Sequence, residues 1–281
     1  MNIGIAGLGL IGGSMAKAFK FYTPETVLGW NRSPEVIREA KLLGAIDGDL
    51  DDETIGICDY VIVAMYPQLS VDYIKANADR FKEGAIIMDI CGIKKYVCDE
   101  IWPVAREKGF TFVGAHPMAG IERSGFKNSF HAMFNNASMI LTPADMSDDK
   151  LISRLTQFWG QIGFGHIEVT TPANHDRVIA YTSQLAHITS NAYIKSATAL
   201  NHAGFSAGSY KDLTRVAYLN EGMWTELFLE NRENLLNETE TLIKNLQEYA
   251  EALRENDPVR LKQILKEGRE LKELADKNDL R

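Results

Sequence analysis

The chain has 281 residues, of which 45% are hydrophobic and 24% charged, as in a soluble globular protein of about two domains. Its formal net charge of −8 disfavours a nucleic-acid-binding protein, because such proteins usually present a basic face. No apolar run approaches the ~20 residues of a membrane span, and the N-terminus has neither the basic region nor the cleavage site of a signal peptide. We therefore expect a cytoplasmic protein with no nucleic-acid or membrane partner.

The three cysteines form no recognisable disulfide or metal pattern. Cys58, Cys91 and Cys98 are irregularly spaced, with no CxxC pair and no cysteine–histidine cluster. This usage is typical of a protein from a reducing compartment. We expect no metal site.

Short apolar runs alternate with amphipathic stretches over the first 170 residues. The runs have the length of strands and are Ile3–Leu8, Thr26–Trp30, Tyr60–Met65, Ala85–Ile90, Thr111–Ala115, Ser138–Leu141 and Gly165–Val169. The stretches between them include Ser14–Phe21, Glu35–Leu43 and Ser70–Phe81. Apolar strands separated by helices indicate a mainly parallel sheet covered on both faces. Residues 1–170 are thus predicted to form a doubly wound α/β domain.

A glycine-rich segment directly follows the first predicted strand. It reads Gly7-Leu8-Gly9-Leu10-Ile11-Gly12 and matches the GxGxxG pattern between a strand and a helix. The first glycine permits a tight turn, the second lets a pyrophosphate approach the backbone, and the third lets helix and strand pack closely. The segment predicts a Rossmann-like dinucleotide-binding domain. The alternative is a glycine-rich turn without a ligand.

The end of the second predicted strand bears on the choice of dinucleotide. An NAD-preferring site usually has an acidic residue here for the ribose 2′-hydroxyl. This chain has Asn31, Arg32 and Ser33 instead. A neutral asparagine does not repel a 2′-phosphate, an arginine can pair with it, and a serine adds a hydroxyl donor. The sequence favours NADP+, while NAD+ stays open if Arg32 is a solvated residue and Asn31 binds the plain ribose.

Two loops beyond the sheet carry candidate catalytic residues. Asp89–Lys94 follows the fourth predicted strand and His116–Gly125 the fifth, at carboxyl ends where open α/β sheets bind ligands. A histidine beside the nicotinamide can accept a hydroxyl proton while a hydride leaves the same carbon. We assign that role to His116. The alternative is a histidine that only hydrogen-bonds its own loop.

Residues 171–281 have an all-helical pattern with no further strands. His175–Ala199 and Trp224–Leu253 each read as one long helix, and Asp257-Pro258 begins a third. Long apolar helices need partners, so we expect an all-α substrate-binding and dimerisation domain and a homodimer. The alternative is a monomer whose helices pack only on the first domain.

Five segments together form a highly specific combination. They are GLGLIGGS from Gly7, Asp89–Lys94, HPMAGIERSG from His116, SQLAH from Ser183, and KDLTR from Lys211 followed by Trp224. This combination resembles the TyrA family, the prephenate and arogenate dehydrogenases of tyrosine biosynthesis, from Asn2 to about Asn256. The resemblance implies oxidative decarboxylation of prephenate to 4-hydroxyphenylpyruvate, with hydride transfer to NAD(P)+. Arogenate is the alternative substrate.

The resemblance also implies roles for single residues. His116 is the hydrogen-bond acceptor at the substrate hydroxyl, and Arg215 holds the ring carboxylate in a contact worth roughly 1.5–3 kcal/mol. His187 contacts the pyruvyl side chain, and Trp224 walls the same pocket. The charged candidates are the acidic Glu122 and Asp212 near the mouth of the cleft, and Lys94 and Lys211, which attract the dianion unless they are solvated surface charges.

The chain departs from the family pattern at three positions. Cys91 stands where many relatives have a serine that helps position the hydroxyl and the histidine, and a thiol is a weaker partner. Ile121 replaces a threonine of some relatives. Gln184 replaces a histidine, and its neutral amide cannot pair with the amino group of arogenate, which favours prephenate. The nearest carboxylate in that segment is Asp176. The chain has no chorismate mutase-like or regulatory region, so we expect a monofunctional enzyme.

Two other readings share the glycine motif. A β-hydroxyacid dehydrogenase would use a lysine on the long helix, for which Lys195 is the candidate. A non-catalytic nucleotide sensor would bind the dinucleotide without turnover. Neither explains the HPMAG and KDLTR segments.

Overall fold

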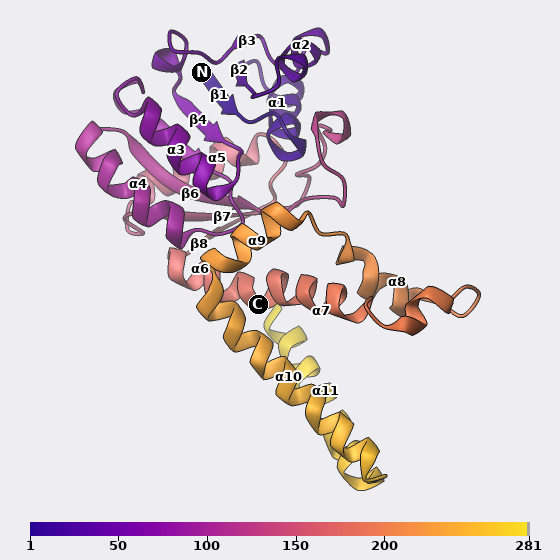
Figure 1. Cartoon of the computed structure of the whole chain (residues 1–281). Coiled ribbons are helices and arrows are strands. Elements are labelled where there is room, and N and C mark those ends of the chain that lie inside the picture. The colour runs from indigo at the N-terminus through magenta and orange to yellow at the C-terminus, as the bar shows by residue number, and fades with distance from the viewer. Residues whose placement is uncertain (280–281) are drawn as a thin grey trace. The chain divides into compact units, whose positions relative to one another are not determined.

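Within residues 1–279, which the computed structural model describes, the strands form an eight-stranded sheet (Figure 1). The strands are β1 (Asn2–Ala6), β2 (Thr26–Trp30), β3 (Gly48–Asp49), β4 (Tyr60–Val63), β5 (Ile86–Asp89), β6 (Thr111–Pro117), β7 (Ser138–Pro143) and β8 (His166–Val169). Their order is β3-β2-β1-β4-β5-β6-β7-β8, and every neighbouring pair is parallel except β6 and β7. All the predicted strands are present. The additional β3 has two residues, too few to produce an apolar run.

Helices cover both faces of this sheet. They are α1 (Leu10–Tyr22), α2 (Pro34–Leu42), α3 (Pro67–Asn77), α4 (Lys95–Lys108) and α5 (Asp149–Gly160). Successive strand residues point to opposite faces, so Ile62 joins the apolar cluster under α1 and α5, while Val61 and Val63 join the cluster under α3 and α4. The architecture is the doubly wound, Rossmann-like one expected from the sequence. It brings the loops after β1, β4, β5 and β6 to one edge.

Beyond β8, the residues that the structure describes form helices and no further strand. These helices are α6 (Pro172–Ile179), α7 (Ala186–Tyr193), α8 (Gly208–Thr214), α9 (Glu221–Glu230), α10 (Arg232–Arg254) and α11 (Pro258–Asp279). Side chains fix two of the starts: the Thr171 hydroxyl accepts from the backbone N–H of Asn174 at 3.2 Å, and Asn220 does the same for Met223 at 3.0 Å. The start of the last helix at Pro258 is as predicted.

Both predicted long helices are divided. The segment His175–Ala199 contains α6, a π-helical turn at Ala180–Leu185, and α7, which ends at Tyr193. The segment Trp224–Leu253 is interrupted at Asn231, whose backbone (φ −114°, ψ 26°) is not helical. The Asn231 amide donates to the carbonyl oxygen of Asp176 and to Gln184. The single-helix predictions were therefore wrong, because apolar spacing continues across breaks that tertiary hydrogen bonds impose.

The chain divides into two compact units, Met1–Asn231 and the residues from Arg232 onward. Helices α6 to α9 thus belong to the same unit as the sheet, and α10 and α11 form the second unit. The last two residues of the predicted helical domain, 280 and 281, lie outside the described residues. In the described part of the chain no helix is both long and apolar enough to span a bilayer.

Candidate active site

The glycine-rich loop at the end of β1 has the backbone geometry of a phosphate cradle. Gly7 has φ +99°, and a Cβ there would lie 2.4 Å from the carbonyl oxygen of Ala64. A Cβ at Gly12 would lie 2.0 Å from the oxygen of Gly7, so the third glycine permits the close packing of α1. At Gly9, by contrast, a Cβ would meet nothing within 4 Å. Gly9 precedes the free N–H groups of the 13-residue α1, an arrangement suited to a pyrophosphate.

Of the three residues that follow β2, one binds the glycine-rich loop and the other two are exposed. The side-chain oxygen of Asn31 accepts from the backbone N–H of Leu8 at 3.1 Å and so ties the strand end to the glycine loop. Arg32 and Ser33 are exposed, and within residues 1–279 neither side chain makes a hydrogen bond or ion pair. Both remain available to a ligand.

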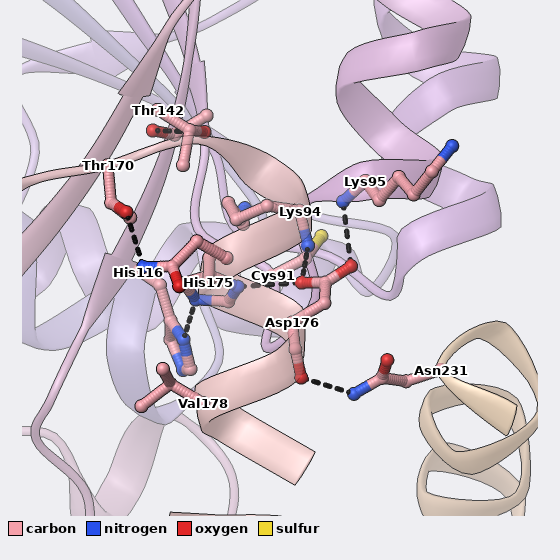
Figure 2. A network of polar contacts seen from close by, with 12 residues as sticks. Cys91, Lys94, Lys95, His116, Thr142, Thr170, His175, Asp176, Val178 and Asn231 are labelled. Carbon is pink, nitrogen blue, oxygen red and sulfur yellow. Dashed lines mark hydrogen bonds and ion pairs between the residues drawn. The ribbon is translucent and has the colours of Figure 1, made fainter. Parts of the chain in front are cut away.

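His116 lies on β6 and belongs to a chain of three side chains, which Figure 2 shows. Its Nδ1 lies 2.9 Å from Nε2 of His175, and Nδ1 of His175 lies 2.6 Å from Oδ1 of Asp176. His116 is partly buried, whereas His175 and Asp176, both on α6, are 2% and 1% exposed. We call these three residues the histidine–aspartate chain.

Both histidines of this chain are held neutral by their surroundings. Burial, with smaller contributions from His175 and the Lys94 ammonium, lowers the pKa of His116 well below its ordinary value. Burial also lowers the pKa of His175, although its hydrogen bond to Asp176 opposes this shift. A neutral histidine can accept a proton, as a base at the substrate hydroxyl must.

Behind His116 lies a fully buried ion pair. The Lys94 ammonium bonds the carboxylate of Asp89 and donates to the carbonyl oxygen of Ala115 at 2.8 Å. Although burial opposes the charge, the neighbouring Asp89 raises the pKa of Lys94 above its ordinary value. The lysine therefore neither attracts substrate from a solvated surface nor lines the site. It joins the end of β5 to the residue before His116.

The loop after β5 approaches His116 through Gly92. A Cβ built there would lie 3.9 Å from Nε2 of His116 and 3.6 Å from a methyl group of Leu227 on α9. Position 92 thus faces the free nitrogen of His116 across a small space. Cys91 points elsewhere: its thiol contacts the Ser70 hydroxyl and the carbonyl oxygen of Met65, both at 3.4 Å.

Helix α9 carries the aromatic wall of the site. One turn before Leu227, the ring of Trp224 lies 4.1 Å from that of His187 on α7. Nδ1 of His187 donates to the carbonyl oxygen of Ser183 at 2.8 Å, and its Nε2 makes no hydrogen bond with any of the described residues. A cavity of about 400 Å³ lies beside Trp224, lined also by Asn191, Tyr218, Thr225 and Phe228. The structure thus brings His187 and Trp224 together as expected.

Comparison with known proteins identifies the family. The model of the prephenate dehydrogenase nucleotide-binding domain matches residues 15–168, and that of the prephenate dehydrogenase dimerization domain matches residues 171–267. The chain belongs to the prephenate dehydrogenase family. It is therefore an NAD(P)-dependent oxidoreductase, and the β-hydroxyacid dehydrogenase and sensor readings fall away.

The relatives match over most of their length. The cyclohexadienyl dehydrogenase of Zymomonas mobilis is 30% identical, over 99% of this chain and 97% of its own. The prephenate dehydrogenase of Bacillus subtilis is 27% identical, over 96% of this chain and 74% of its own. The solved structure of prephenate dehydrogenase from Aquifex aeolicus, in complex with hydroxyphenyl propionate and NAD+, covers 98% of both chains with a TM-score of 0.84 and 27% identity.

Two residues predicted from family likeness have their polar atoms turned to protein partners. Cys91 is 4% exposed, and within residues 1–279 no hydrogen bond joins it to His116. Gln184 is 2% exposed; its amide donates to the carbonyl oxygen of Leu227 at 3.0 Å and accepts from Asn231 at 2.7 Å. This placement argues against direct contact of either side chain with prephenate. Gln184 instead links the π-helical turn to α9.

Of the charged residues predicted near the cleft, two form an ion pair with each other and two others are exposed. Arg215 forms an ion pair with Glu122, which belongs to the His116–Gly125 segment.

 Glu122 thus lies in the loop that follows His116, and the ion pair ties this loop to the turn after α8. Lys211 and Asp212 on α8 are exposed, and in the described part of the chain their side chains make no ion pair or hydrogen bond. No group of His, Cys, Asp or Glu among the described residues is arranged to hold a metal.

Sequence reasoning missed His175 and the role of Asp176. Both stand at the start of a helix with no motif around them, and only the fold places them behind His116. The adjacent pair His175-Asp176 directly after a strand and a Thr-Pro helix start was the one available signal. Asp176 does not face a substrate amino group, because both of its oxygens accept backbone N–H groups, those of Lys94 and Lys95.

Proposed function

We propose that this protein is a prephenate dehydrogenase, which converts prephenate and NAD(P)+ to 4-hydroxyphenylpyruvate, carbon dioxide and NAD(P)H. The observation that carries the proposal is a neutral, partly buried histidine, His116, at the sheet edge that also holds the dinucleotide loop. When bound, the nicotinamide supplies the hydride acceptor for C4 of prephenate. Family membership supports the reaction, and the geometry of this chain supports the residue roles that we propose below.

His116 is the base at the C4 hydroxyl. Its Nε2 makes no hydrogen bond within residues 1–279 and faces the space beside Gly92. It accepts the hydroxyl proton as the hydride leaves C4. Loss of the ring carboxylate as carbon dioxide then restores aromaticity, and the proton returns to the phenolate oxygen, so the reaction releases no net proton.

The substrate carboxylates need cations and a pocket. Arg215 is the partner of the ring carboxylate, to which it offers charge-assisted hydrogen bonds once Glu122 releases it. His187 and Trp224 form the wall for the pyruvyl side chain, with the free Nε2 of His187 as the polar contact. Lys211 and Asp212 are exposed on α8, shortly before Arg215, and act on the substrate through their charge.

Prephenate is favoured over arogenate as the substrate. Arogenate carries an amino group, which calls for a carboxylate partner. Asp176 stands eight residues before Gln184, and its carboxylate oxygens are engaged by His175 and two backbone N–H groups. Arogenate dehydrogenase activity stays the second candidate, since Glu122 is a carboxylate that Arg215 could release.

NADP+ is the favoured cofactor, bound through Arg32 and Ser33. Both side chains are exposed and unengaged at the end of β2, where a 2′-phosphate would lie. Arg32→Ala should weaken NADP+ binding by about tenfold or more, the loss of a charge-assisted contact, and leave NAD+ binding unchanged. Arg38→Ala, an exposed arginine paired with Glu35 on α2, is the matched control. Equal affinity of Arg32→Ala and the wild type for NADP+ would contradict the assignment.

We infer a homodimer formed through the helical half, in the cytoplasm. The match to a dimerization domain supports the assembly. Exposed apolar residues along α10 and α11 also support it: Leu236, Ile243, Leu246, Leu253, Leu265, Leu271 and Leu274. Sedimentation velocity of the purified chain should give twice the monomer mass.

The proposal is tested by initial rates of nicotinamide reduction with prephenate or arogenate, each paired with NADP+ or NAD+. We expect turnover of prephenate, faster with NADP+ than with NAD+. His116→Asn should retain cofactor binding and lose turnover by roughly 10²–10⁴-fold. Absence of turnover in all four pairs, in a protein that binds the cofactor, would overturn the proposed function. Full turnover by His116→Asn would overturn the choice of base.

A further inference from the structure

We propose that His175, oriented by Asp176, fixes the tautomer of His116, so that Nδ1 of His116 carries the hydrogen and Nε2 is the free acceptor. His175 is then a positioning residue for the base and not a catalytic residue. The identity of the substrate in this inference rests on the proposed function. The tautomer itself does not.

The direction of each hydrogen bond follows from Asp176. Its carboxylate accepts the backbone N–H groups of Lys94 at 2.7 Å and Lys95 at 2.9 Å, at the start of α4. This carboxylate thus acts as a hydrogen-bond acceptor on both of its oxygens, at a helix N-terminus, which favours negative charge. It can therefore only accept from His175, whose Nδ1, at 2.6 Å, must carry the hydrogen.

The same rule then sets His116. A neutral imidazole has one N–H, so His175 with hydrogen on Nδ1 presents a bare Nε2. That nitrogen accepts from Nδ1 of His116 at 2.9 Å. His116 in turn has no hydrogen on Nε2, the nitrogen that faces Gly92. If His116 carried its hydrogen on Nε2, that nitrogen would offer no lone pair to the substrate. If His175 carried its hydrogen on Nε2, this N–H group would point at the N–H group on Nδ1 of His116.

The charged groups around the two histidines favour this neutral arrangement. From the N-terminus of α4, the Lys94 ammonium disfavours a proton on either ring, while Asp89 at the end of β5 neutralises part of that charge. From α6, Asp176 is the group that favours a charged His175. Once Nε2 of His116 accepts the substrate proton, the hydrogen bond from Nδ1 to His175 strengthens, and Asp176 stabilises the resulting positive charge.

The backbone makes this orientation rigid. Asp176 is fixed by α4, and the Asn231 amide binds its carbonyl oxygen at 2.8 Å. The carboxylate and both rings therefore come from elements that are held together independently of any ligand. A purely structural role of the same contacts, which join α6 to α4, is the alternative that an experiment must separate.

The direct test is the ¹⁵N spectrum of the ring nitrogens in the wild-type protein, with His116 assigned by comparison with His116→Asn. We expect Nε2 of His116 to have the shift of an unprotonated nitrogen and Nδ1 that of a protonated one. The opposite assignment would overturn the proposal. This readout requires no turnover, so it stands even if prephenate is not the substrate, whereas a wild-type protein inactive on prephenate would overturn only the proposed function.

Two variants separate positioning from packing. His175→Gln keeps an oxygen that can accept from Nδ1 of His116, whereas His175→Phe keeps the bulk and loses the acceptor. We expect His175→Phe to bind the cofactor normally and to lose kcat by about 10²-fold or more, with mixed tautomers of His116, and His175→Gln to recover most of both. The control His166→Gln removes an exposed histidine and should leave kcat unchanged. A folded His175→Phe with wild-type kcat and tautomer would overturn the proposal.

Discussion

The dinucleotide loop and the histidine–aspartate chain lie at the same edge of one sheet but depend on the sequence in different ways. The loop is built from consecutive residues, and its function depends on backbone positions where a side chain would not fit, as at Gly7 and Gly12. The histidine–aspartate chain is built from two elements, β6 and α6, and its two histidines, His116 and His175, are 59 positions apart in the sequence. Local motifs therefore reveal the cofactor site, while the groups that tune the base emerge only from tertiary packing.

The buried ion pair between these two regions should give the largest effect on stability. Lys94→Met leaves the Asp89 carboxylate buried without its cation, which should lower the free energy of unfolding by about 3–5 kcal/mol. Lys95→Met, one residue further on, removes a lysine exposed on α4 and paired with Asp99 and should cost less than about 1 kcal/mol. Urea unfolding of both variants checks the difference. Equal unfolding free energies would mean that the pair does not hold the edge together.

Substitutions at two glycines of the loop should affect either the stability of the fold or the binding of the cofactor. Gly12→Ala places a Cβ against the oxygen of Gly7 and should destabilise the protein by about 3 kcal/mol, as overpacking does. Gly9→Ala meets no protein atom, so its unfolding free energy should stay close to that of the wild type, while its affinity for the cofactor falls. Thermal unfolding and cofactor titration measure the two effects. A Gly9→Ala protein that binds NADP+ like the wild type would show that no ligand approaches this position.

The same contrast explains what the sequence could and could not predict. The strands, the glycine loop and the start of α11 follow from local composition, and the structure contains them. The break at Asn231 and the inward position of Gln184 depend on amide contacts between distant helices, which leave no local pattern. Cys91 shows a subtler limit: a shift of one residue along the loop decides which position faces His116, and in this chain it is Gly92.

The pH dependence of turnover should show the lowered pKa of His116. The base must be neutral, so kcat/KM falls as the pH drops through the pKa of His116 in the free enzyme. Because burial, His175 and Lys94 lower that pKa well below its ordinary value, kcat/KM should stay constant through the range where an ordinary histidine becomes protonated, and fall only at lower pH. Initial rates over a pH series, with prephenate below KM, measure this limb. A limb at the pKa of an exposed histidine would contradict the assigned environment.

Removing the ion pair of Glu122 with Arg215 should have the smallest effect of these changes, seen in the KM or kcat for prephenate. Both side chains are partly exposed, and such pairs contribute about 0.2–1 kcal/mol, so their loss changes an equilibrium by less than about sixfold. If Glu122 competes with the ring carboxylate for Arg215, Glu122→Gln should lower the KM for prephenate within that range and leave kcat unchanged. If Glu122 instead orders the loop after His116, the same variant should lower kcat. Steady-state kinetics distinguishes the two cases, and Arg215→Gln, which should raise KM in either case, tests whether the guanidinium binds the ring carboxylate.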